Sequence, residues 1–328
     1  MYRKAIVIAK KILPRSIFLK IKHTYARVIE HEKYAWKKMP SQGIMIELTN
    51  ACNFSCTMCA NKLMQREKGF MDIGLFELVL DRVQKAKISR ITLFTTGESL
   101  LHPKFLDMLQ RAVRRRSIKE IAISTNGSLL EKYMGEILKT NKTRVYYSFS
   151  GWDKKSYEGR YLGGVFEKTV ATMTFFNKMI HEAGLPSETL IAYGIIDNDE
   201  AKEKTINFLT NTIGLNTCQI SVRFPFNWVV SVLGDHGGGG NESTYEEKKA
   251  RAFCWIINSQ LGVLYDGRVT ACACVDVNGD LVIGDISKQS IKEIMRGSKR
   301  KKFLHRFIQG DLKGLLCYEC NNKIYYRA

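Results

Sequence analysis

Residues 44–59 read IMIELTNACNFSCTMC and place three of the nine cysteines of the 328-residue chain directly after a short apolar run. These are Cys52, Cys56 and Cys59. A structural zinc site or a closed iron–sulfur site takes four protein ligands, so a group of three leaves one position open or takes its fourth ligand from elsewhere. Three thiolates on a [4Fe–4S] cluster leave the fourth iron free for a non-protein ligand. We favour this cluster, and two alternatives stay open: a zinc site with three protein ligands and a bound water, or a group of reduced core cysteines.

Short apolar runs alternate with longer amphipathic stretches after Gly43, a pattern typical of strands and helices in turn. About six such units predict an α/β fold whose parallel sheet is closed or nearly closed into a TIM-like barrel, with its chemistry at the carboxyl ends of the strands. Cys218 lies in the last apolar run and is expected in the core. The expected strands are 44–48, 90–94, 120–124, 144–149, 190–195 and 217–223, and the expected helices are 75–84, 104–114, 130–138, 166–183 and 202–211.

Glycine and charge divide the chain into four segments. Four consecutive glycines, 237–240, cannot hold a fixed conformation by themselves and indicate a linker. After it, an Asp-Gly pair between two apolar runs predicts a β-hairpin over 262–274, followed by helices near 290–296 and 299–308. The predicted segments are a basic helical extension (1–40), the barrel (41–233), the glycine-rich linker (234–248) and a small α+β domain (249–328).

The chain is strongly basic, since 51 Lys and Arg against 32 Asp and Glu give 51 − 32 = +19. Residues 1–40 hold eleven of the basic residues against Glu30 and Glu32, which gives 11 − 2 = +9. Such a charge attracts an anionic partner, for example nucleic acid, a membrane surface or a phosphorylated substrate. For residues 1–40 two interpretations stay open: solvated helix faces, or peripheral contact with an anionic membrane.

The sequence predicts a protein of a reducing compartment. No apolar run approaches the roughly 20 residues of a membrane span, and the first residues lack the pattern of a signal peptide. Cysteines spaced as CxxxCxxC and CxxC are ligands far more often than disulfides in such a compartment. We therefore expect a cytoplasmic protein, either free or in peripheral contact with the inner face of the membrane.

The cysteine stretch and three later loops together resemble the radical S-adenosylmethionine (SAM) superfamily over residues 44–230. The hallmark of this family is CxxxCxφC on the loop after the first strand of a partial (β/α)6 barrel. Met58 occupies the φ position here, where many members have an aromatic residue. The resemblance implies that Cys52, Cys56 and Cys59 hold a [4Fe–4S] cluster and that SAM binds its open iron.

Each of the three later loops follows an expected strand. TTGE at 95–98 resembles the family's GGE segment, STNG at 124–127 resembles its S/T-N-G turn, and SFSG at 148–151 resembles its SxDG segment. By this resemblance the first loop holds the amino group of SAM, and the second places polar side chains at the ribose and carboxylate. The residues carried over as SAM contacts are Met58, Gly97, Glu98, Ser124, Asn126 and Ser148.

A second set of cysteines follows the glycine linker. The spacing Cys-x12-Gly-x4-Cys with a distant CxxC resembles the auxiliary-cluster domain called SPASM, or twitch in its shortened form. The resemblance implies one auxiliary [4Fe–4S] cluster with four ligands, and closed clusters carry electrons. Cys274 is an alternative to Cys272 as a ligand, because the two side chains share a face of the expected strand. A zinc ribbon built from the four cysteines is an alternative to the iron–sulfur cluster. The expected ligands are Cys254, Cys272, Cys317 and Cys320.

The resemblance implies an oxidoreductase. In this family a 5′-deoxyadenosyl radical takes a hydrogen atom from the substrate, and an auxiliary cluster can accept the electron that follows. Because twitch relatives include an aminocyclitol dehydrogenase, we expect dehydrogenation of a hydroxyl on a sugar-like or glycan-precursor substrate, with a flavodoxin- or ferredoxin-type reductant. Arg223, at the end of the last expected barrel strand, is the candidate substrate contact.

Two other functions stay open. The first is an enzyme of the same chemistry that matures or crosslinks a ribosomal peptide; we see no obvious leader-binding domain, which favours the small substrate. The second is an RNA-binding or membrane-docked iron–sulfur protein without turnover. We do not expect nucleic acid as a partner.

Overall fold

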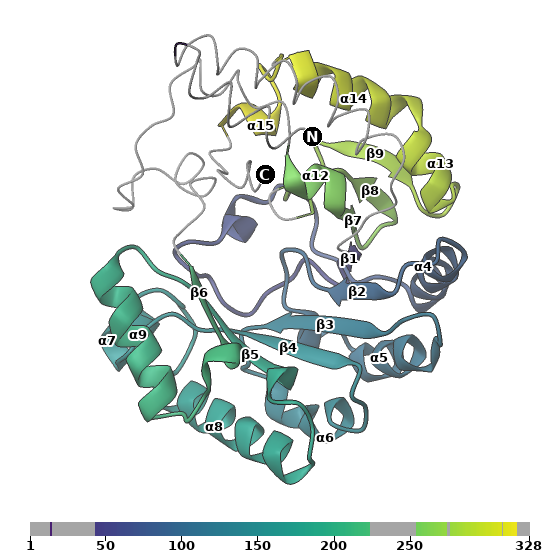
Figure 1. The fold of residues 1–328 in the computed structure, drawn as a ribbon. Coiled ribbons are helices and arrows are strands. Elements are labelled where there is room, and N and C mark those ends of the chain that lie inside the picture. Colours follow the sequence, from purple (N-terminus) through teal and green to yellow (C-terminus); the bar gives the residue numbers. More distant parts are fainter. Residues whose placement is uncertain (1–13, 15–42, 224–253, 274–275, 310, 320–328) are drawn as a thin grey trace.

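The computed structural model describes residues 14, 43–223, 254–273, 276–309 and 311–319 (Figure 1). Apart from Pro14, the predicted basic extension lies outside these residues, and so does the predicted glycine-rich linker. Cys274 and Cys320 also lie outside them. The predicted division into domains therefore stays a prediction.

One sheet runs through the described part of the chain, in the order β6-β5-β4-β3-β2-β1-β7-β8-β9. The strands from β1 to β6 pair in parallel, each with the next one along the chain. β6 and β9 form the two edges, so the barrel is open and the predicted partial (β/α)6 barrel is confirmed. The six strands are β1 (Ile44–Ile46), β2 (Arg90–Leu93), β3 (Glu120–Thr125), β4 (Thr143–Ser148), β5 (Leu190–Ile195) and β6 (Ile220–Arg223).

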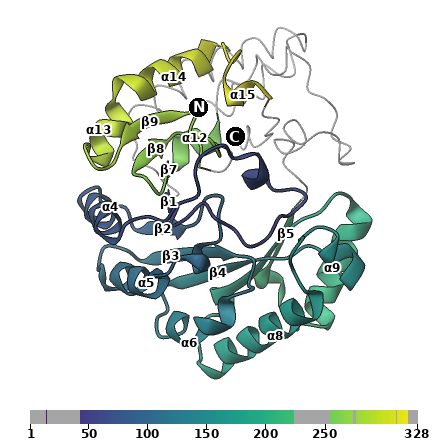
Figure 2. The ribbon, with the colours of Figure 1, turned by 180° about the vertical axis from the view of Figure 1, so that it is seen from behind.

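Helices follow the strands and cover the outer face of the curved sheet (Figures 1 and 2). The predicted helix 130–138 is instead a 3-10 helix, Leu130–Lys132, and one short α-helix, because Tyr133 between them has a φ of −118°, outside the helical range. The short helix α7, which a capping box between Asp153 and Ser156 begins, was not predicted. The helices are α4 (Ile73–Lys85), α5 (Phe105–Arg114), α6 (Met134–Ile137), α7 (Lys154–Glu158), α8 (Phe166–Glu182) and α9 (Asp199–Asn211).

The predicted core position of Cys218 is wrong. Residues 217–219 form a 3-10 helix in place of the first part of the expected strand, and Cys218 is exposed. The side chain of Asn216 accepts a hydrogen bond from the backbone N–H of Cys218 at 3.0 Å, and such local bonds compete with strand pairing. β6 therefore begins only at Ile220.

Side chains alternate across the sheet and give it a buried face, against the helices, and a half-exposed face. In β4 every second residue is buried, whereas Tyr146 and Ser148 are half-buried. Paired residues of parallel strands point to the same face, and Ser124 pairs with Tyr146 while Ser148 pairs with Tyr193. Ser124 and Ser148, both predicted to contact SAM, therefore lie on the face opposite the helices.

The C-terminal part continues the same sheet (Figure 1). β7 (Leu261–Val263) pairs in parallel with β1, and β8 (Arg268–Thr270) pairs antiparallel with β7, which confirms the predicted hairpin. β9 (Val282–Asp285), which was not predicted, pairs antiparallel with β8. The small α+β part thus shares its sheet with the barrel. Its helices are α12 (Trp255–Ser259), α13 (Ile291–Arg296), α14 (Ser298–Gln309) and α15 (Leu316–Glu319). No helix in the described part of the chain is long and apolar enough to cross a membrane.

An aromatic cluster fills the space behind the carboxyl end of β4. Phe149 is fully buried, and its ring stacks on Tyr157 at a centroid distance of 5.3 Å and on Phe208 at 5.9 Å. We expect Phe149→Ala to lower the free energy of unfolding by about 3–5 kcal/mol, because it leaves a cavity. Phe175, on α8, is 52% exposed, and the same change there costs about 0.5 kcal/mol or less. Urea unfolding followed by circular dichroism checks this, and equal losses in both variants would contradict it.

Candidate active site

The three clustered cysteines lie on the loop that leaves β1, and residues 49–69 are called the cysteine loop below. All three are half-buried. The backbone N–H of Phe54 donates to Cys52 Sγ at 3.5 Å, and that of Asn61 donates to Cys59 Sγ at 3.4 Å, where Cys59 caps the 3-10 helix Ala60–Leu63. Hydrogen bonds of this kind favour the ionised form of a thiol, which is the form that binds metal.

Two asparagine side chains join the ends of the cysteine loop. Asn50 is fully buried; its Nδ2 donates to the carbonyl of Glu67 at 2.8 Å, and its Oδ1 accepts from the N–H of Gly69 at 2.9 Å. Asn61 Nδ2 donates to the carbonyl of Asn50 at 2.9 Å and to that of Thr96 at 2.8 Å. The loop is therefore closed on itself and fastened to the loop after β2.

The middle of the cysteine loop is held by the segment after α7. Ser55 N–H donates to the carbonyl of Leu162, and Thr57 N–H donates to the carbonyl of Arg160, both at 2.9 Å. The guanidinium of Arg160 forms an ion pair with Asp197, which follows β5. The cysteines therefore lie between the loops after β2 and β3 on one side and the segment after α7 on the other.

Burial makes these thiols poor acids in the metal-free chain. It raises the pKa of Cys52 to about 11 and that of Cys56 to about 12, and the neighbouring thiolates add to both shifts. Burial also raises the pKa of Cys59, although nearby Lys68 and Lys62 oppose the shift. The three become thiolates together only when a positively charged group binds them. Three sulfur donors on one loop whose ionised forms require positive charge fit an iron–sulfur cluster.

The TTGE loop, residues 95–98, packs directly against the cysteine loop. A Cβ atom added to Gly97 would lie 2.1 Å from the carbonyl oxygen of Thr49 and 2.8 Å from that of Ala51. The next residue, Glu98, donates its N–H to the same carbonyl of Ala51 at 2.8 Å. Only glycine fits this approach, which supports the predicted place of Gly97 in the site.

The carboxylate of Glu98 joins the loops after β2 and β3. One oxygen accepts from Leu100 N–H at 3.0 Å and from Thr125 Oγ1 at 2.9 Å, and the other accepts from Asn126 N–H at 2.8 Å. Complete burial raises the pKa of Glu98 to about 7. The side chain thus positions the STNG turn, and its predicted contact with the amino group of SAM stays a prediction.

Asn126 reaches the first cysteine. Its Nδ2 lies 3.9 Å from Cys52 Sγ and donates to Asn53 Oδ1 at 3.0 Å, while its Oδ1 accepts from Ser128 N–H at 3.0 Å. The structure therefore brings the turn after β3 to the edge of the cysteine loop, and the contact of Asn126 with SAM stays a prediction.

The remaining predicted residues are more scattered. Met58 is half-buried and packs against the core, and Ser124 and Ser148 lie on the half-exposed face of the sheet. Arg223, the predicted substrate contact, is exposed at the end of β6 and pairs in register with Ile195. The structure places all four on or near the edge at which the parallel strands end.

Three of the predicted auxiliary ligands are described. Cys254 is buried at the start of α12, Cys272 is buried two residues after β8, and Cys317 is half-buried in α15. All three contribute to the C-terminal part of the core. Among the described residues, no three or more His, Cys, Asp or Glu side chains are close enough together to hold a single metal ion. The assignment of these ligands stays a prediction.

Comparison with protein families decides the class. The model of the radical SAM superfamily matches residues 46–209, half of the chain. The chain belongs to the radical SAM superfamily. The model of the SPASM iron–sulfur cluster-binding domain matches residues 254–321, the range that contains all four predicted auxiliary ligands. The protein is therefore a radical SAM enzyme that uses SAM and a [4Fe–4S] cluster, with a C-terminal domain for auxiliary iron–sulfur binding.

Individual relatives differ in what they act on. A tungsten-containing aldehyde ferredoxin oxidoreductase cofactor-modifying protein of Pyrococcus furiosus is 25% identical over 255 residues, 70% of each chain. The structure of BtrN in complex with AdoMet and 2-DOIA is 19% identical with a TM-score of 0.57, covering 87% of this chain and 94% of BtrN. Streptococcus suis SuiB bound to its precursor peptide SuiA is 11% identical with a TM-score of 0.58, covering 94% and 77%. The two structures show a shared fold.

Sequence reasoning missed the residues that shape the cysteine loop: Glu47, Asn61, Arg66 and Arg160. Glu47 carries a signal, because it is a charged residue inside the apolar run IMIEL. The other three carry none, because their partners are distant in sequence.

The cysteine assignment predicts iron content. The anaerobically reconstituted protein should hold about eight irons, and the variant with Cys52, Cys56 and Cys59 replaced by Ala should hold about four. Exposed Cys218 is the matched control, and Cys218→Ala should leave the iron content unchanged. Iron and sulfide analysis checks this. A triple variant that still holds the full content would contradict the assignment.

The tight approach at Gly97 predicts a specific loss of SAM chemistry. We expect Gly97→Ala to slow the formation of 5′-deoxyadenosine from SAM by about 100-fold, because the added methyl group displaces the cysteine loop. A Cβ at Gly135, on α6, meets nothing within 4 Å, so Gly135→Ala should keep the wild-type rate. Anaerobic assays with dithionite at several SAM concentrations measure both. A wild-type rate in Gly97→Ala would refute the assigned role.

Proposed function

We propose that this protein is a radical SAM dehydrogenase that oxidises a hydroxyl of a sugar-like or glycan-precursor substrate, with the auxiliary cluster as electron acceptor. The observation that carries the proposal is a charged pair beside the cysteine loop, formed by Arg160 and Asp197. A guanidinium donates hydrogen bonds and a carboxylate accepts them, so together they suit a substrate rich in hydroxyl groups.

The Arg160–Asp197 pair lies at the edge at which the barrel strands end. Its side chains keep 21% and 37% of their surface exposed, so a substrate can reach them. Arg160 Nη1 also donates to the carbonyl of Ile195 at 3.4 Å, the last residue of β5. Burial lowers the pKa of Arg160. The backbone carbonyl of the same arginine binds the cysteine loop at Thr57, which ties the pair to the cluster site.

The proposed reaction removes two hydrogens from the substrate. When bound, the cluster and SAM supply a 5′-deoxyadenosyl radical, which removes one hydrogen atom from the carbinol carbon. To turn its hydroxyl into a carbonyl, the substrate would also lose one electron, which an auxiliary cluster held by the C-terminal cysteines would accept, and one proton. Asp197 is the carboxylate of the charged pair and is the proposed acceptor of that proton.

A peptide substrate is the second candidate. The fold shared with BtrN, solved with AdoMet and 2-DOIA, supports a small substrate, and the fold shared with SuiB, solved with its precursor peptide, supports a ribosomal peptide. The half-exposed charged pair favours the small, hydroxyl-rich one. A flavodoxin- or ferredoxin-type reductant, a cytoplasmic location, the substrate contact at Arg223 and membrane contact through residues 1–40 stay predictions.

Deuterium transfer tests the substrate class. The reconstituted protein is incubated anaerobically with SAM, dithionite and a panel of polyols, aminocyclitols and nucleotide sugars deuterated at the carbinol carbon. We expect deuterium in 5′-deoxyadenosine together with an equal amount of carbonyl product. Transfer from a peptide instead would favour the second candidate. Intact clusters without any 5′-deoxyadenosine would contradict both.

The charged pair provides a matched control within this assay. We expect Asp197→Asn to slow carbonyl formation about 100-fold, because it removes the proton acceptor and leaves Arg160 unpaired. Asp199→Asn, two residues later and exposed at the start of α9, should keep the wild-type rate.

A further inference from the structure

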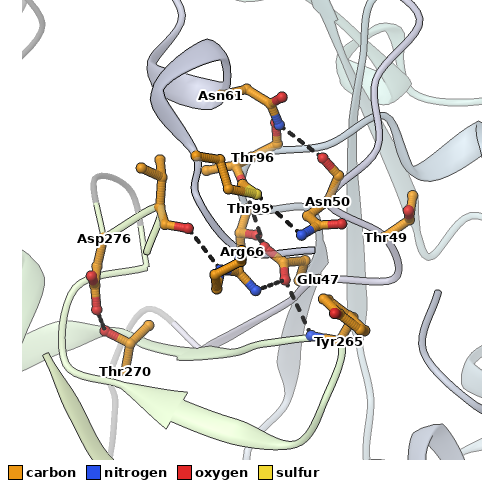
Figure 3. Close-up of polar contacts among 12 residues, drawn as sticks. Glu47, Thr49, Asn50, Asn61, Arg66, Thr95, Thr96, Tyr265, Thr270 and Asp276 are labelled. Carbon is orange, nitrogen blue, oxygen red and sulfur yellow. Dashed lines mark hydrogen bonds and ion pairs between the residues drawn. The ribbon is translucent and has the colours of Figure 1, made fainter. Parts of the chain in front are cut away.

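Glu47 places a buried carboxylate at the point where the chain leaves β1. The residue is 1% exposed, and its two oxygens accept from Arg66, Nη1 to Oε1 at 2.9 Å and Nη2 to Oε2 at 2.8 Å (Figure 3). The Arg66 side chain is itself 7% exposed. Two parallel bonds between a planar guanidinium and a carboxylate are strong and fix the orientation of both groups.

Three more donors complete the surroundings of this carboxylate. Thr95 Oγ1 and Thr96 Oγ1, in the loop after β2, donate to Oε2 at 2.8 and 3.1 Å. The backbone N–H of Tyr265, just after β7, donates to Oε1 at 3.2 Å. Glu47 therefore fixes three segments relative to β1: the returning arm of the cysteine loop, the TTGE loop and the C-terminal hairpin (Figure 3).

Arg66 extends the connection into the C-terminal part. Its Nε donates to the carbonyl of Val277 at 2.7 Å, and its guanidinium lies 5.8 Å from the centre of the Tyr265 ring. The N–H of the preceding residue, Gln65, donates to Asn278 Oδ1 at 2.8 Å. The arm that returns from Cys59 is thus bonded to two neighbouring residues of the loop after β8.

Residues 276–281, in the loop after β8, are held by hydrogen bonds among themselves and to β8. Asp276 is buried and accepts from the hydroxyl of Thr270 (Figure 3). It also accepts from Asp280 N–H at 2.7 Å and from Leu281 N–H at 2.9 Å. The hydrogen bonds that Arg66 and Gln65 donate to Val277 and Asn278 therefore reach a segment that Asp276 holds in place. The contact joins the stretch that carries the SAM-site cysteines to a stretch that carries a predicted auxiliary ligand.

The Glu47–Arg66 pair is not what holds the two parts together. β1 and β7 already pair along their length, and the N–H of Glu47 donates to the carbonyl of Val263 at 2.8 Å. An apolar pair of similar volume often stabilises a protein as well as a buried ion pair does, but it lacks directed bonds. The directed hydrogen bonds of the ion pair instead fix the position of the cysteine loop relative to β1 and Val277.

We propose that Glu47 and Arg66 are positioning residues that fix the cysteine loop relative to the loop after Cys272, and so set the rate at which an electron passes between the two clusters. The proposal deepens the proposed function and rests on it for the presence of an auxiliary cluster. Neither residue contacts the reacting atoms.

Electron exchange between the clusters tests this without a substrate. In reconstituted protein, one electron is introduced by photoreduction and its redistribution between the two clusters is followed by freeze-quench EPR. We expect Arg66→Lys, which keeps the charge but loses the bidentate geometry, to slow the redistribution about tenfold with both clusters retained. The control is Arg90→Met, which breaks a half-exposed ion pair with Glu120 at the amino ends of β2 and β3, away from the cysteine loop. It should keep the wild-type rate of electron redistribution.

A double variant separates position from stability. Glu47→Gln with Arg66→Met removes both buried charges, so it should unfold near the wild-type urea midpoint and hold both clusters while its electron redistribution stays slow. A wild-type rate in the double variant, or loss of a cluster from Arg66→Lys, would overturn the proposal. The iron content of the wild type distinguishes the two hypotheses: only about four irons would count against the proposed function. About eight irons together with an unaltered rate of electron redistribution in every variant would count only against the positioning role of Glu47 and Arg66.

Discussion

The structure depends on ordering one loop that carries three cysteines, none of which lies within a helix or strand. Burial and mutual repulsion oppose their ionisation, so the loop must be ordered by groups outside the cysteines before the cluster can bind. The neighbouring loops supply this order, because parallel pairing of β1 to β5 brings the carboxyl ends of all these strands to one edge. The reactive site is therefore a property of the sheet as much as of the CxxxCxxC motif.

Two buried glutamates, Glu98 and Glu47, order different loops at that edge. Among the described residues, no arginine pairs with Glu98; neutral donors from the loops after β2 and β3 bind it, and burial raises its pKa to about 7. Glu47 has Arg66, whose guanidinium matches both carboxylate oxygens and continues to Val277. Neutral donors suffice to join two adjacent loops of the barrel, whereas the guanidinium has the length to connect three segments. Each acid is saturated with donors, which is the condition for burying a charge without large cost.

The sequence was sufficient to predict the features that depend on local pattern. Alternating apolar runs located the six barrel strands β1 to β6, and the spacing of Cys52, Cys56 and Cys59 indicated the cluster and the family. The hairpin could be predicted from the Asp266-Gly267 pair, because its turn places Gly267 at a φ of 89°, which glycine adopts easily. The Glu47 contacts could not be predicted, since its partners lie up to 218 residues away. The prediction that Cys218 lies in the core was wrong for the opposite reason. A local hydrogen bond from its N–H to Asn216 outweighed the apolar pattern that had predicted a strand.

The direction of β7 is what brings the C-terminal part to the reactive edge. Because β7 runs parallel to β1, its carboxyl end and Tyr265 lie beside the start of the cysteine loop; an antiparallel strand would have placed them at the opposite edge. The same pairing makes the site sensitive to register. A slip of one residue between β1 and β7 moves the N–H of Tyr265 by about 3.3 Å, beyond hydrogen-bond reach of Glu47. The carboxylate would then lose a donor inside a buried site, which penalises the slipped pairing. A single acid in an apolar strand run thus both orders the cysteine loop and selects the register that places this loop beside the stretch that carries Cys272.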